Sequence, residues 1–216
     1  MKTYPINLID LVNRRVVVIG GGNVAERKIG GLIEAGAHVH VISPQVSPEI
    51  EAWVKAGRLT WQARPYQSGD LAGAFIVFSA TDDGAVNQAA WQEAQSTGCL
   101  INVCDDPARS NFIAPAVVRR GEMAITVSTG GASPALARSL REELEERFGA
   151  EYGDFVALLA DLRPQLLARF PAGKLRLQAA QRLVHSDVLH VLQNKGYTAA
   201  QVRAEEVLVE AAAEIL

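Results

Sequence analysis

The sequence predicts an α/β protein: a parallel β-sheet covered by helices, then a short strand-and-helix region, then helices alone. Short apolar runs alternate with segments of helical spacing until about residue 111. This alternation implies crossover connections and therefore a parallel sheet with helices on both faces. From about residue 150 to residue 216 the chain is rich in alanine and leucine, which favours helices.

The expected strands of the sheet are short apolar runs. The first, RVVVI at residues 15–19, has no polar alternation, which is typical of a strand buried on both faces. The second ends at Ser43-Pro44, because proline breaks the hydrogen-bond ladder and the residue before it prefers extended geometry. The four strands expected after the first are HVHVI at 38–42, LTWQAR at 59–64, AFIVFSA at 74–80 and CLINVC at 99–104.

Helices are expected between these strands. The spacing changes from strand to helix within residues 20–37, GGGNVAERKIGGLIEAGA. Residues 47–57 carry helix boundary signals, since Ser47 can cap the helix and Gly57 can end it. Residues 84–98 also have helical spacing.

The second half of the chain starts with a strand, MAITVS at 123–128, and a long charged helix at 134–149. Ser133 followed by Pro134 is a strong signal for the start of that helix. The helical region after it is punctuated by residues that interrupt helices: Pro164, Pro171, Gly173 and Gly196.

Composition excludes several classes of protein. The 216 residues are 49% hydrophobic and 21% charged, with a formal net charge of −3, which argues against disorder and against a strongly basic nucleic-acid coat. No apolar run approaches the roughly 18 residues that cross a bilayer, and the first residues lack the apolar centre of a signal peptide. We therefore expect a cytoplasmic chain with no membrane or nucleic-acid partner. The two cysteines, Cys99 and Cys104, make neither a disulfide framework nor a metal cluster by their spacing.

A glycine-rich loop follows the first strand. Gly20, Gly22 and Ala25 form a G-x-G-x-x-A pattern between a predicted strand and a predicted helix, which is the context that dinucleotide binding requires. Gly20 permits the tight turn, and Gly22 lets the backbone approach a pyrophosphate. The N–H groups near Asn23 and Val24 would then meet the phosphates. The pattern predicts a Rossmann-like domain; the alternative is a glycine turn without a ligand.

The residues that would contact the adenosine ribose follow the second strand. An Asp or Glu about 20 residues beyond the loop normally binds the ribose of NAD. Here the strand ends at Ser43, Pro44 and Gln45, which contribute neither a carboxylate to repel a 2′-phosphate nor an arginine to attract one. The choice between NAD and NADP is therefore weakly encoded.

Five segments, in order, resemble the precorrin-2 dehydrogenase family, the module of siroheme biosynthesis that occurs alone or fused to a methyltransferase. The resemblance is strong over about residues 4–150 and loose over the helical end. The segments are GGGNVAERK at 20–28, SATDD at 79–83, INVCDDP at 101–107, NFIAPAVVRRG at 111–121 and VSTGGASPALAR at 127–138.

The resemblance implies a function and an organisation. The family oxidises precorrin-2 to sirohydrochlorin with NAD as hydride acceptor, and some members also insert Fe²⁺. It implies a Rossmann domain at 1–112, a dimerisation region at 113–149 and a helical domain at 150–216, assembled as a homodimer. We favour a dehydrogenase over a bifunctional dehydrogenase and ferrochelatase, because no clear ligand cluster for Fe²⁺ is visible. A rival of another class is an NAD(H)-sensing regulatory module.

The resemblance also assigns site residues. The family's key aspartate, in its N-V-x-D-x-P segment, falls on Asp105, which could take a proton or hold a pyrrole N–H. Alternatively, Asp105 or Asp106 caps the turn before Pro107; we favour Asp105 as the site residue and Asp106 as turn chemistry. The cofactor contacts expected from the family and from the strand ends are Asn23, Val24, Pro44, Gln45, Thr81 and Asp82, with Ser43 adjoining them.

Precorrin-2 is a polycarboxylate, so its binding asks for cations and backbone donors. Ser128, Thr129 and Gly130 precede a helix and could form an anion-binding nest, although a plain strand-to-helix turn fits equally well. The candidate cations are Arg27, Lys28, Arg119, Arg120 and Arg138, each of which could instead be an ordinary surface residue. No metal site is expected from the four histidines, His38, His40, His185 and His190.

Overall fold

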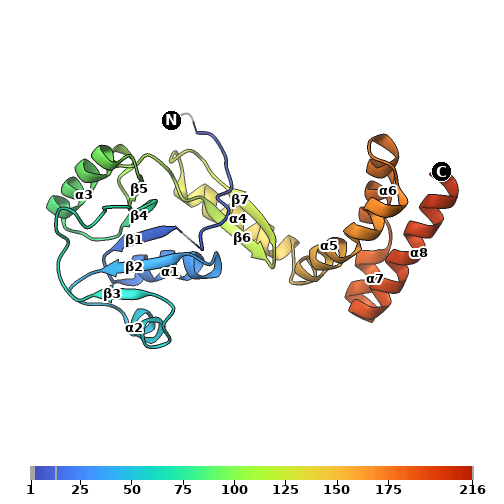
Figure 1. Cartoon of the computed structure of the whole chain (residues 1–216), viewed down its shortest axis with the longest axis horizontal. Coiled ribbons are helices and arrows are strands. Elements are labelled where there is room, and N and C mark those ends of the chain that lie inside the picture. Colours follow the sequence, from blue (N-terminus) through green and yellow to red (C-terminus); the bar gives the residue numbers. More distant parts are fainter. Residues whose placement is uncertain (1–2, 13, 216) are drawn as a thin grey trace. The chain divides into compact units, whose positions relative to one another are not determined.

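The computed structural model describes residues 3–12 and 14–215, and it divides the chain into two compact units, residues 1–114 and residues 115–216 (Figure 1). The first unit contains the predicted α/β sheet, which confirms the fold class. The second unit contains a hairpin and helices. The boundary between the units falls within the NFIAPAVVRRG segment. The assignment of residues 113–149 to a dimerisation region stays a prediction.

The first unit is built on a five-stranded parallel sheet with the strand order β3-β2-β1-β4-β5. β1 lies at the centre, and three of its residues, Val16, Val17 and Val18, are completely buried, as the absence of polar alternation predicts. All five strands occur where the sequence predicts strands. They are β1 Arg15–Ile19, β2 His38–Ile42, β3 Thr60–Gln62, β4 Ile76–Ser79 and β5 Leu100–Val103.

Helices cover both faces of this sheet (Figure 1). On one face Val18 and Phe78 pack in a core with Ile29 of α1. On the other face Val17 packs in a core with Ala90 of α3. The helical elements of the unit are α1 Asn23–Glu34, α2 Pro48–Lys55, α3 Gly84–Thr97 and the short 3₁₀ helix η1 Pro107–Arg109. Because alternate strand residues face different helices, the sheet is a rigid platform whose carboxyl edge remains available for ligands.

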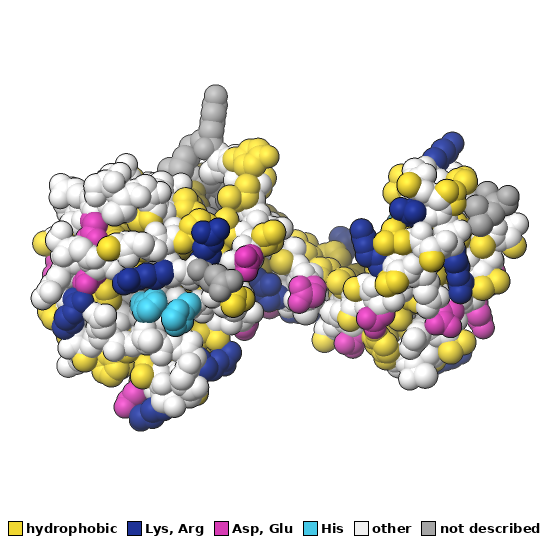
Figure 2. Space-filling view, in the orientation of Figure 1, with side chains coloured by type: hydrophobic (Ala, Val, Ile, Leu, Met, Phe, Trp, Pro, Cys, Tyr) yellow, Lys and Arg dark blue, Asp and Glu magenta, His cyan; other side chains and the backbone are white. Residues whose placement is uncertain are grey.

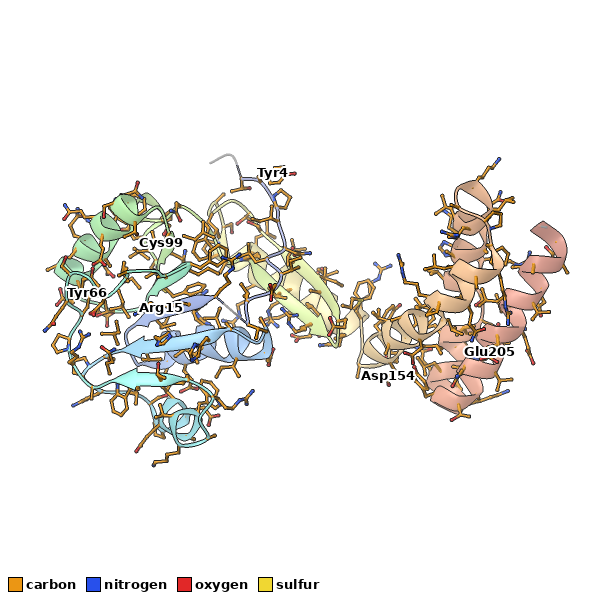
Figure 3. All side chains as sticks on the ribbon, in the orientation of Figure 1. Tyr4, Arg15, Tyr66, Cys99, Asp154 and Glu205 are labelled. Carbon is orange, nitrogen blue, oxygen red and sulfur yellow. The ribbon has the colours of Figure 1, made fainter. Side chains whose placement is uncertain are left out.

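The loop that follows β3 is fastened to α3. Tyr66 of this loop is labelled in Figure 3. Its hydroxyl donates to the carboxylate of Glu93, which also accepts the backbone N–H groups of Gly69 and Leu71. Burial and the neighbouring Glu93 raise the pKa of Tyr66 well above its usual value. These hydrogen bonds hold residues 66–71 against α3, although this loop contains no helix or strand.

The second unit begins with an antiparallel hairpin, β6 Ala116–Arg120 and β7 Met123–Val127, on which α4 Pro134–Arg147 packs. The sequence predicted β7 and α4 but not β6. Arg120, expected as a candidate for substrate binding, donates from its guanidinium to the carbonyls of Glu145 and Phe148 at the end of α4. Its hydrogen bonds therefore stabilise the helix end.

Four helices follow: α5 Glu151–Arg169, α6 Lys174–Val184, α7 Val188–Lys195 and α8 Tyr197–Ile215. Phe155, Leu158 and Leu162 of α5 and Leu208 of α8 are buried in their shared core. Pro164, which the sequence suggested as an interruption, lies inside α5, and the helix continues to Arg169. Among the described residues, no helix combines the length and the apolar character that crossing a membrane requires.

Candidate functional site

The glycine loop joins β1 to α1 and is wedged between the ends of two other strands. The N–H of Gly20 donates to the carbonyl of Ile42, and the N–H of Ala80 donates to the carbonyl of Ile19, at 2.9 and 2.7 Å. Gly20 has a φ of +109°, and a β-carbon there would overlap the carbonyl oxygen of Ala80. Residue 20 must therefore be glycine for both conformational and steric reasons.

The next two glycines have different roles. A β-carbon at Gly21 would overlap the carbonyl oxygen of Gln45 and stand 2.8 Å from Cγ1 of Val46. The N–H of Ser47 donates to the carbonyl of Gly21, which fastens the loop after β2 to the glycine loop. The G-x-G-x-x-A pattern leaves position 21 open, so sequence reasoning missed this role. A β-carbon at Gly22, in contrast, would meet nothing within 4 Å, so the backbone there faces open space.

The start of α1 is available to an anion. Its N-cap residue, Gly22, makes no side-chain cap, whereas Ser47 caps α2 and Asp83 caps α3. The first N–H groups of a helix have no intrahelical acceptor and carry a partial positive charge. Asn23 and Val24 are exposed at this point. Uncapped donors beside open space fit the pyrophosphate of a dinucleotide.

The residues that follow β2 form the loop next to the glycine loop. Ser43 is only 8% exposed, and its hydroxyl donates to the carbonyl of Gln45 at 2.6 Å. The indole N–H of Trp61 donates to the carbonyl of Ser43. Ser43 therefore holds the loop in shape, and the exposed side chains of Pro44 and Gln45 face solvent.

A carboxylate lies beside the loop that follows β2. Ser47 accepts the N–H of Ile50 as the cap of α2, and its hydroxyl donates to Oε2 of Glu26 in α1 at 2.6 Å. Glu26 is half-buried. Sequence reasoning found no carboxylate at the end of β2 because this one comes from α1, 21 residues earlier than Ser47 in the chain.

The end of β4 is held by an amide. The buried hydroxyl of Ser79 donates to Oδ1 of Asn87 at 2.7 Å, and the Asn87 amide donates to the carbonyl of Thr81 at 3.0 Å. Thr81 accepts the N–H of Asp83 with its hydroxyl, which leaves Asp82 exposed at the tip of the turn. Ser79 and Asn87 were missed by sequence reasoning, although a serine that ends an apolar run is a signal for such a contact.

The end of β5 carries the two aspartates. Asp106 accepts the N–H groups of Ala108 and Arg109 as the cap of η1 and pairs with the Arg109 guanidinium at 2.7 Å, which matches the turn role expected for it. Asp105 is exposed with a φ of +64°, a conformation that residues other than glycine seldom adopt. Among the described residues, no hydrogen bond or ion pair engages the Asp105 carboxylate.

Lys28 of α1 lies over Phe78 of β4. It is half-buried, with Nζ 5.6 Å from the centre of the Phe78 ring. Burial lowers the pKa of Lys28; the neighbouring Cys104 and Asp105 act in the opposite direction, while Arg27 lowers it further. Burial likewise raises the pKa of Cys104, against the opposing charge of Lys28. An ammonium and a carboxylate thus lie within electrostatic reach at one edge of the sheet.

The remaining predicted residues belong to the second unit. Thr129 accepts the N–H of Ser133 and donates to its carbonyl, and Ser128 accepts the N–H of Gly130. These bonds build a compact turn before α4, as the plain strand-to-helix alternative anticipated. Arg138 is exposed and pairs with Glu142 at 2.9 Å. The part of these residues in substrate binding stays a prediction.

Histidine and cysteine side chains are common ligands of transition metals. His38 and His40 lie side by side on the surface of the first unit with ring centres 4.8 Å apart (Figure 2), and His40 contacts Thr60. Cys99 and Cys104 are free. In the part of the chain that the structure describes, no group of three or more histidine, cysteine, aspartate or glutamate side chains could hold a metal ion.

Two protein-family models match consecutive parts of the chain. Residues 8–116 match the family model described as "Putative NAD(P)-binding". Residues 120–147 match the model described as "Sirohaem biosynthesis protein central". The first match covers the whole sheet with its glycine loop, and the second covers most of the hairpin and α4.

Individual proteins are similar to the chain over most of its length. It is 40% identical over 179 residues to siroheme synthase 1 of Aeromonas salmonicida (83% of this chain, 38% of the relative) and 34% identical over 212 residues to siroheme synthase of Actinobacillus pleuropneumoniae (98% and 42%). The chain thus spans about two fifths of these relatives. A solved structure named "SirC, precorrin-2 dehydrogenase" is similar with a TM-score of 0.71 and 29% identity, covering 97% of this chain and 98% of the other.

Proposed function

This chain belongs to the NAD(P)-binding family of sirohaem biosynthesis, and from that membership we propose that it is a dehydrogenase that oxidises precorrin-2 to sirohydrochlorin with NAD as the hydride acceptor. The observation that carries the proposal is the placement of an unpaired carboxylate, Asp105, at the same sheet edge as the uncapped start of α1. The similarity to a precorrin-2 dehydrogenase structure over nearly its full length supports it.

The dinucleotide would be held by the glycine loop. The N–H groups of Asn23 and Val24 bind the pyrophosphate, and Gly22 allows the backbone to approach it. The remaining contacts with the dinucleotide come from Pro44 and Gln45 after β2 and from Thr81 and Asp82 after β4. Ser43 acts indirectly, because its hydroxyl is bonded to Gln45.

We favour NAD over NADP because of the charge around the loop that follows β2. No arginine or lysine lies in residues 43–47. The carboxylate of Glu26 is bonded to Ser47 in the same loop and adds a negative charge that disfavours a 2′-phosphate. A neutral ribose hydroxyl meets no such repulsion.

Oxidation of the macrocycle removes a hydride and a proton. The nicotinamide of the bound dinucleotide supplies the hydride acceptor. Asp105 accepts the proton from a pyrrole nitrogen, because it is an exposed carboxylate with no partner among the described residues. Arg27 and Lys28 bring positive charge to the same edge for the carboxylates of the substrate.

The second unit carries the other residues that the family resemblance assigns to substrate binding. We propose that the hydroxyl of Ser128 donates to a substrate carboxylate, that Thr129 and Gly130 shape the turn that presents it, and that Arg138 contributes a cation. We also propose a cytoplasmic homodimer assembled through residues 113–149. Sedimentation of a 23.2 kDa particle at working concentration would contradict the dimer.

Incubation with precorrin-2 and NAD⁺ tests the proposal directly. Sirohydrochlorin absorbance is expected to appear with the wild-type chain, more slowly with NADP⁺, and about a hundredfold more slowly with Asp105→Asn, which keeps the shape of the side chain but not its basicity. Binding of NAD⁺ by Asp105→Asn is expected to match the wild type. No product above the rate without protein would overturn the dehydrogenase assignment, and NAD⁺ binding without product would favour a regulatory module. Addition of Fe²⁺ to the product, compared with spontaneous insertion, separates a bifunctional enzyme from a dehydrogenase.

A further inference from the structure

Asp105 stands on a four-residue turn that follows β5. The N–H of Asp106 donates to the carbonyl of Val103 at 3.1 Å, so Cys104 and Asp105 are the two central residues of this turn. The φ of Asp105 is +64°, a value that glycine or asparagine usually supplies at the third position of such a turn. An aspartate in this conformation costs free energy relative to glycine, and a cost of this kind is typical of functional sites.

The hydroxyl of Ser110 is bonded to both ends of this turn. It accepts the N–H of Val103 at 3.0 Å and donates to the carbonyl of Asp106 at 2.8 Å, with the carbonyl of Val103 as a second acceptor at 3.3 Å. Ser110 is half-buried and lies four residues beyond Asp106 in the chain. One side chain thus joins the residue that enters the turn to the residue that leaves it, and its loss would release both ends together.

The other bonds around the turn each fix one of its residues. The N–H of Cys104 donates to the carbonyl of Ser79 at 2.9 Å, which ties the turn to β4. The carboxylate of Asp106 caps η1 and pairs with Arg109 at 2.7 Å. Within the described part of the chain, the hydroxyl of Ser110 is the one side-chain group bonded to both the first and the last residue of the turn.

We propose that Ser110 is a positioning residue for the dehydrogenase reaction and that it acts through Asp105. By joining the two ends of the turn, its hydroxyl keeps Asp105 in the left-handed conformation, and the backbone conformation sets the direction in which the side chain leaves the turn. This inference rests on the proposed role of Asp105 as proton acceptor. Misplacement of a reacting group by about 1 Å can cost on the order of a hundredfold in rate.

Steady-state kinetics with precorrin-2 and NAD⁺ tests this role. Ser110→Ala is expected to lower kcat about tenfold while KM for NAD⁺ changes less than about twofold, and Ser110→Thr, which keeps the hydroxyl, should recover most of the loss. In the Asp105→Asn background the same Ser110→Ala change should cost less than about twofold, because no basic carboxylate is left to orient.

Ser96→Ala is the matched control for the kinetics. The hydroxyl of Ser96 also donates to a backbone carbonyl, that of Glu93 at 2.8 Å, but it lies on the exposed surface of α3. This variant should leave kcat and KM unchanged. An unchanged kcat in Ser110→Ala, a loss of equal size in both backgrounds, or a loss confined to KM for NAD⁺ would overturn the proposal.

Urea unfolding gives a readout that does not depend on activity. Asp105→Gly should have a higher urea midpoint than Asp105→Ala, because glycine adopts a φ of +64° more readily than alanine. Both variants lack the carboxylate, so the difference between their midpoints reports on the backbone. In the Ser110→Ala background the turn can relax, and the difference is expected to fall to less than about half.

The two possible failures can be told apart. A difference between the glycine and alanine variants that Ser110→Ala leaves intact would show that the hydroxyl does not hold residue 105 in its conformation, and it would overturn the role of Ser110 alone. Absence of sirohydrochlorin formation by the wild-type chain would instead overturn the proposed function.

Discussion

The backbone of Gly20 lies directly against the carbonyl group of Ala80, so that a β-carbon at residue 20 would stand 2.7 Å from the Ala80 carbonyl carbon. Sixty residues separate the two positions in the chain. The contact lies where the paired strands β1 and β4 reach the carboxyl edge of the sheet. Because of this contact, even a change of Gly20 to alanine is expected to disturb the loop.

Gly20→Ala should destabilise the first unit by about 2–4 kcal/mol, because the new methyl group meets backbone and because the φ of +109° disfavours alanine. Urea unfolding measures the change. The control is Gly31→Ala in α1, where a β-carbon meets nothing within 4 Å; it should stabilise the protein by about 1 kcal/mol through helix propensity. Equal stabilities for the two variants would contradict the steric account.

Gly22→Ala should separate binding from folding. Residue 22 has a φ of −87°, which alanine adopts readily, and its β-carbon would enter open space. The melting temperature is therefore expected to stay unchanged, while the Kd for NADH rises about tenfold because the methyl group occupies the approach to the pyrophosphate. Fluorescence titration with NADH measures the affinity. Undiminished affinity would show that the dinucleotide does not approach this backbone.

Glu26→Gln should weaken discrimination against NADP. The amide oxygen of glutamine can still accept the Ser47 hydroxyl, but the negative charge beside the loop is lost. The affinity for NADPH is expected to rise about fivefold relative to that for NADH. Glu49→Gln, an exposed change in the first turn of α2, serves as the control and should leave the ratio as it is. An unchanged ratio in Glu26→Gln would place the determinant elsewhere.

Acid stability should depend on Asp70. The Arg64 guanidinium hydrogen-bonds the Asp70 carboxylate, which is 13% exposed, and holds its pKa below the usual value of 3.8. A lowered folded-state pKa means that this stabilisation is present above about pH 4 and is lost as the pH falls through the folded-state value. Asp70→Asn should therefore lower the free energy of unfolding by about 1–2 kcal/mol at pH 7 and by much less near pH 2.

Urea unfolding across this pH range measures the effect of Asp70. Glu146→Gln, which changes an exposed carboxylate of α4, is the control. It is expected to follow the wild-type curve at every pH. A deficit in Asp70→Asn that is the same at pH 2 and pH 7 would mean that the Arg64 charge has no part in it.

Local patterns were enough to predict much of the first unit. The run RVVVI predicts a strand that is buried on both faces, and in the structure this run is β1, the central strand of the sheet. Ser47 and Ser133 were predicted as helix caps, and both side chains accept the N–H of the residue three positions later. Capping and strand burial depend on a few consecutive residues, which is why they can be read without a structure.

Other features depend on partners that are distant in the chain. β6 was missed because its residues form a strand only when β7 pairs with them. Pro164 was expected to interrupt a helix, but packing of the α5 face carries the helix past it. The roles of Gly21 and Ser79 depend on Gln45 and Asn87, which no local pattern identifies.

The sequence by itself determined the sheet, the glycine loop and the candidate aspartate, because strand periodicity, turn chemistry and family motifs are properties of short stretches of chain. Only the tertiary structure decided which charges act on one another. Glu26 meets the loop after β2 through Ser47, and Glu93 accepts the hydroxyl of Tyr66 across 27 positions. Electrostatic interaction depends on separation in space and on burial, and neither quantity is encoded by position along the chain.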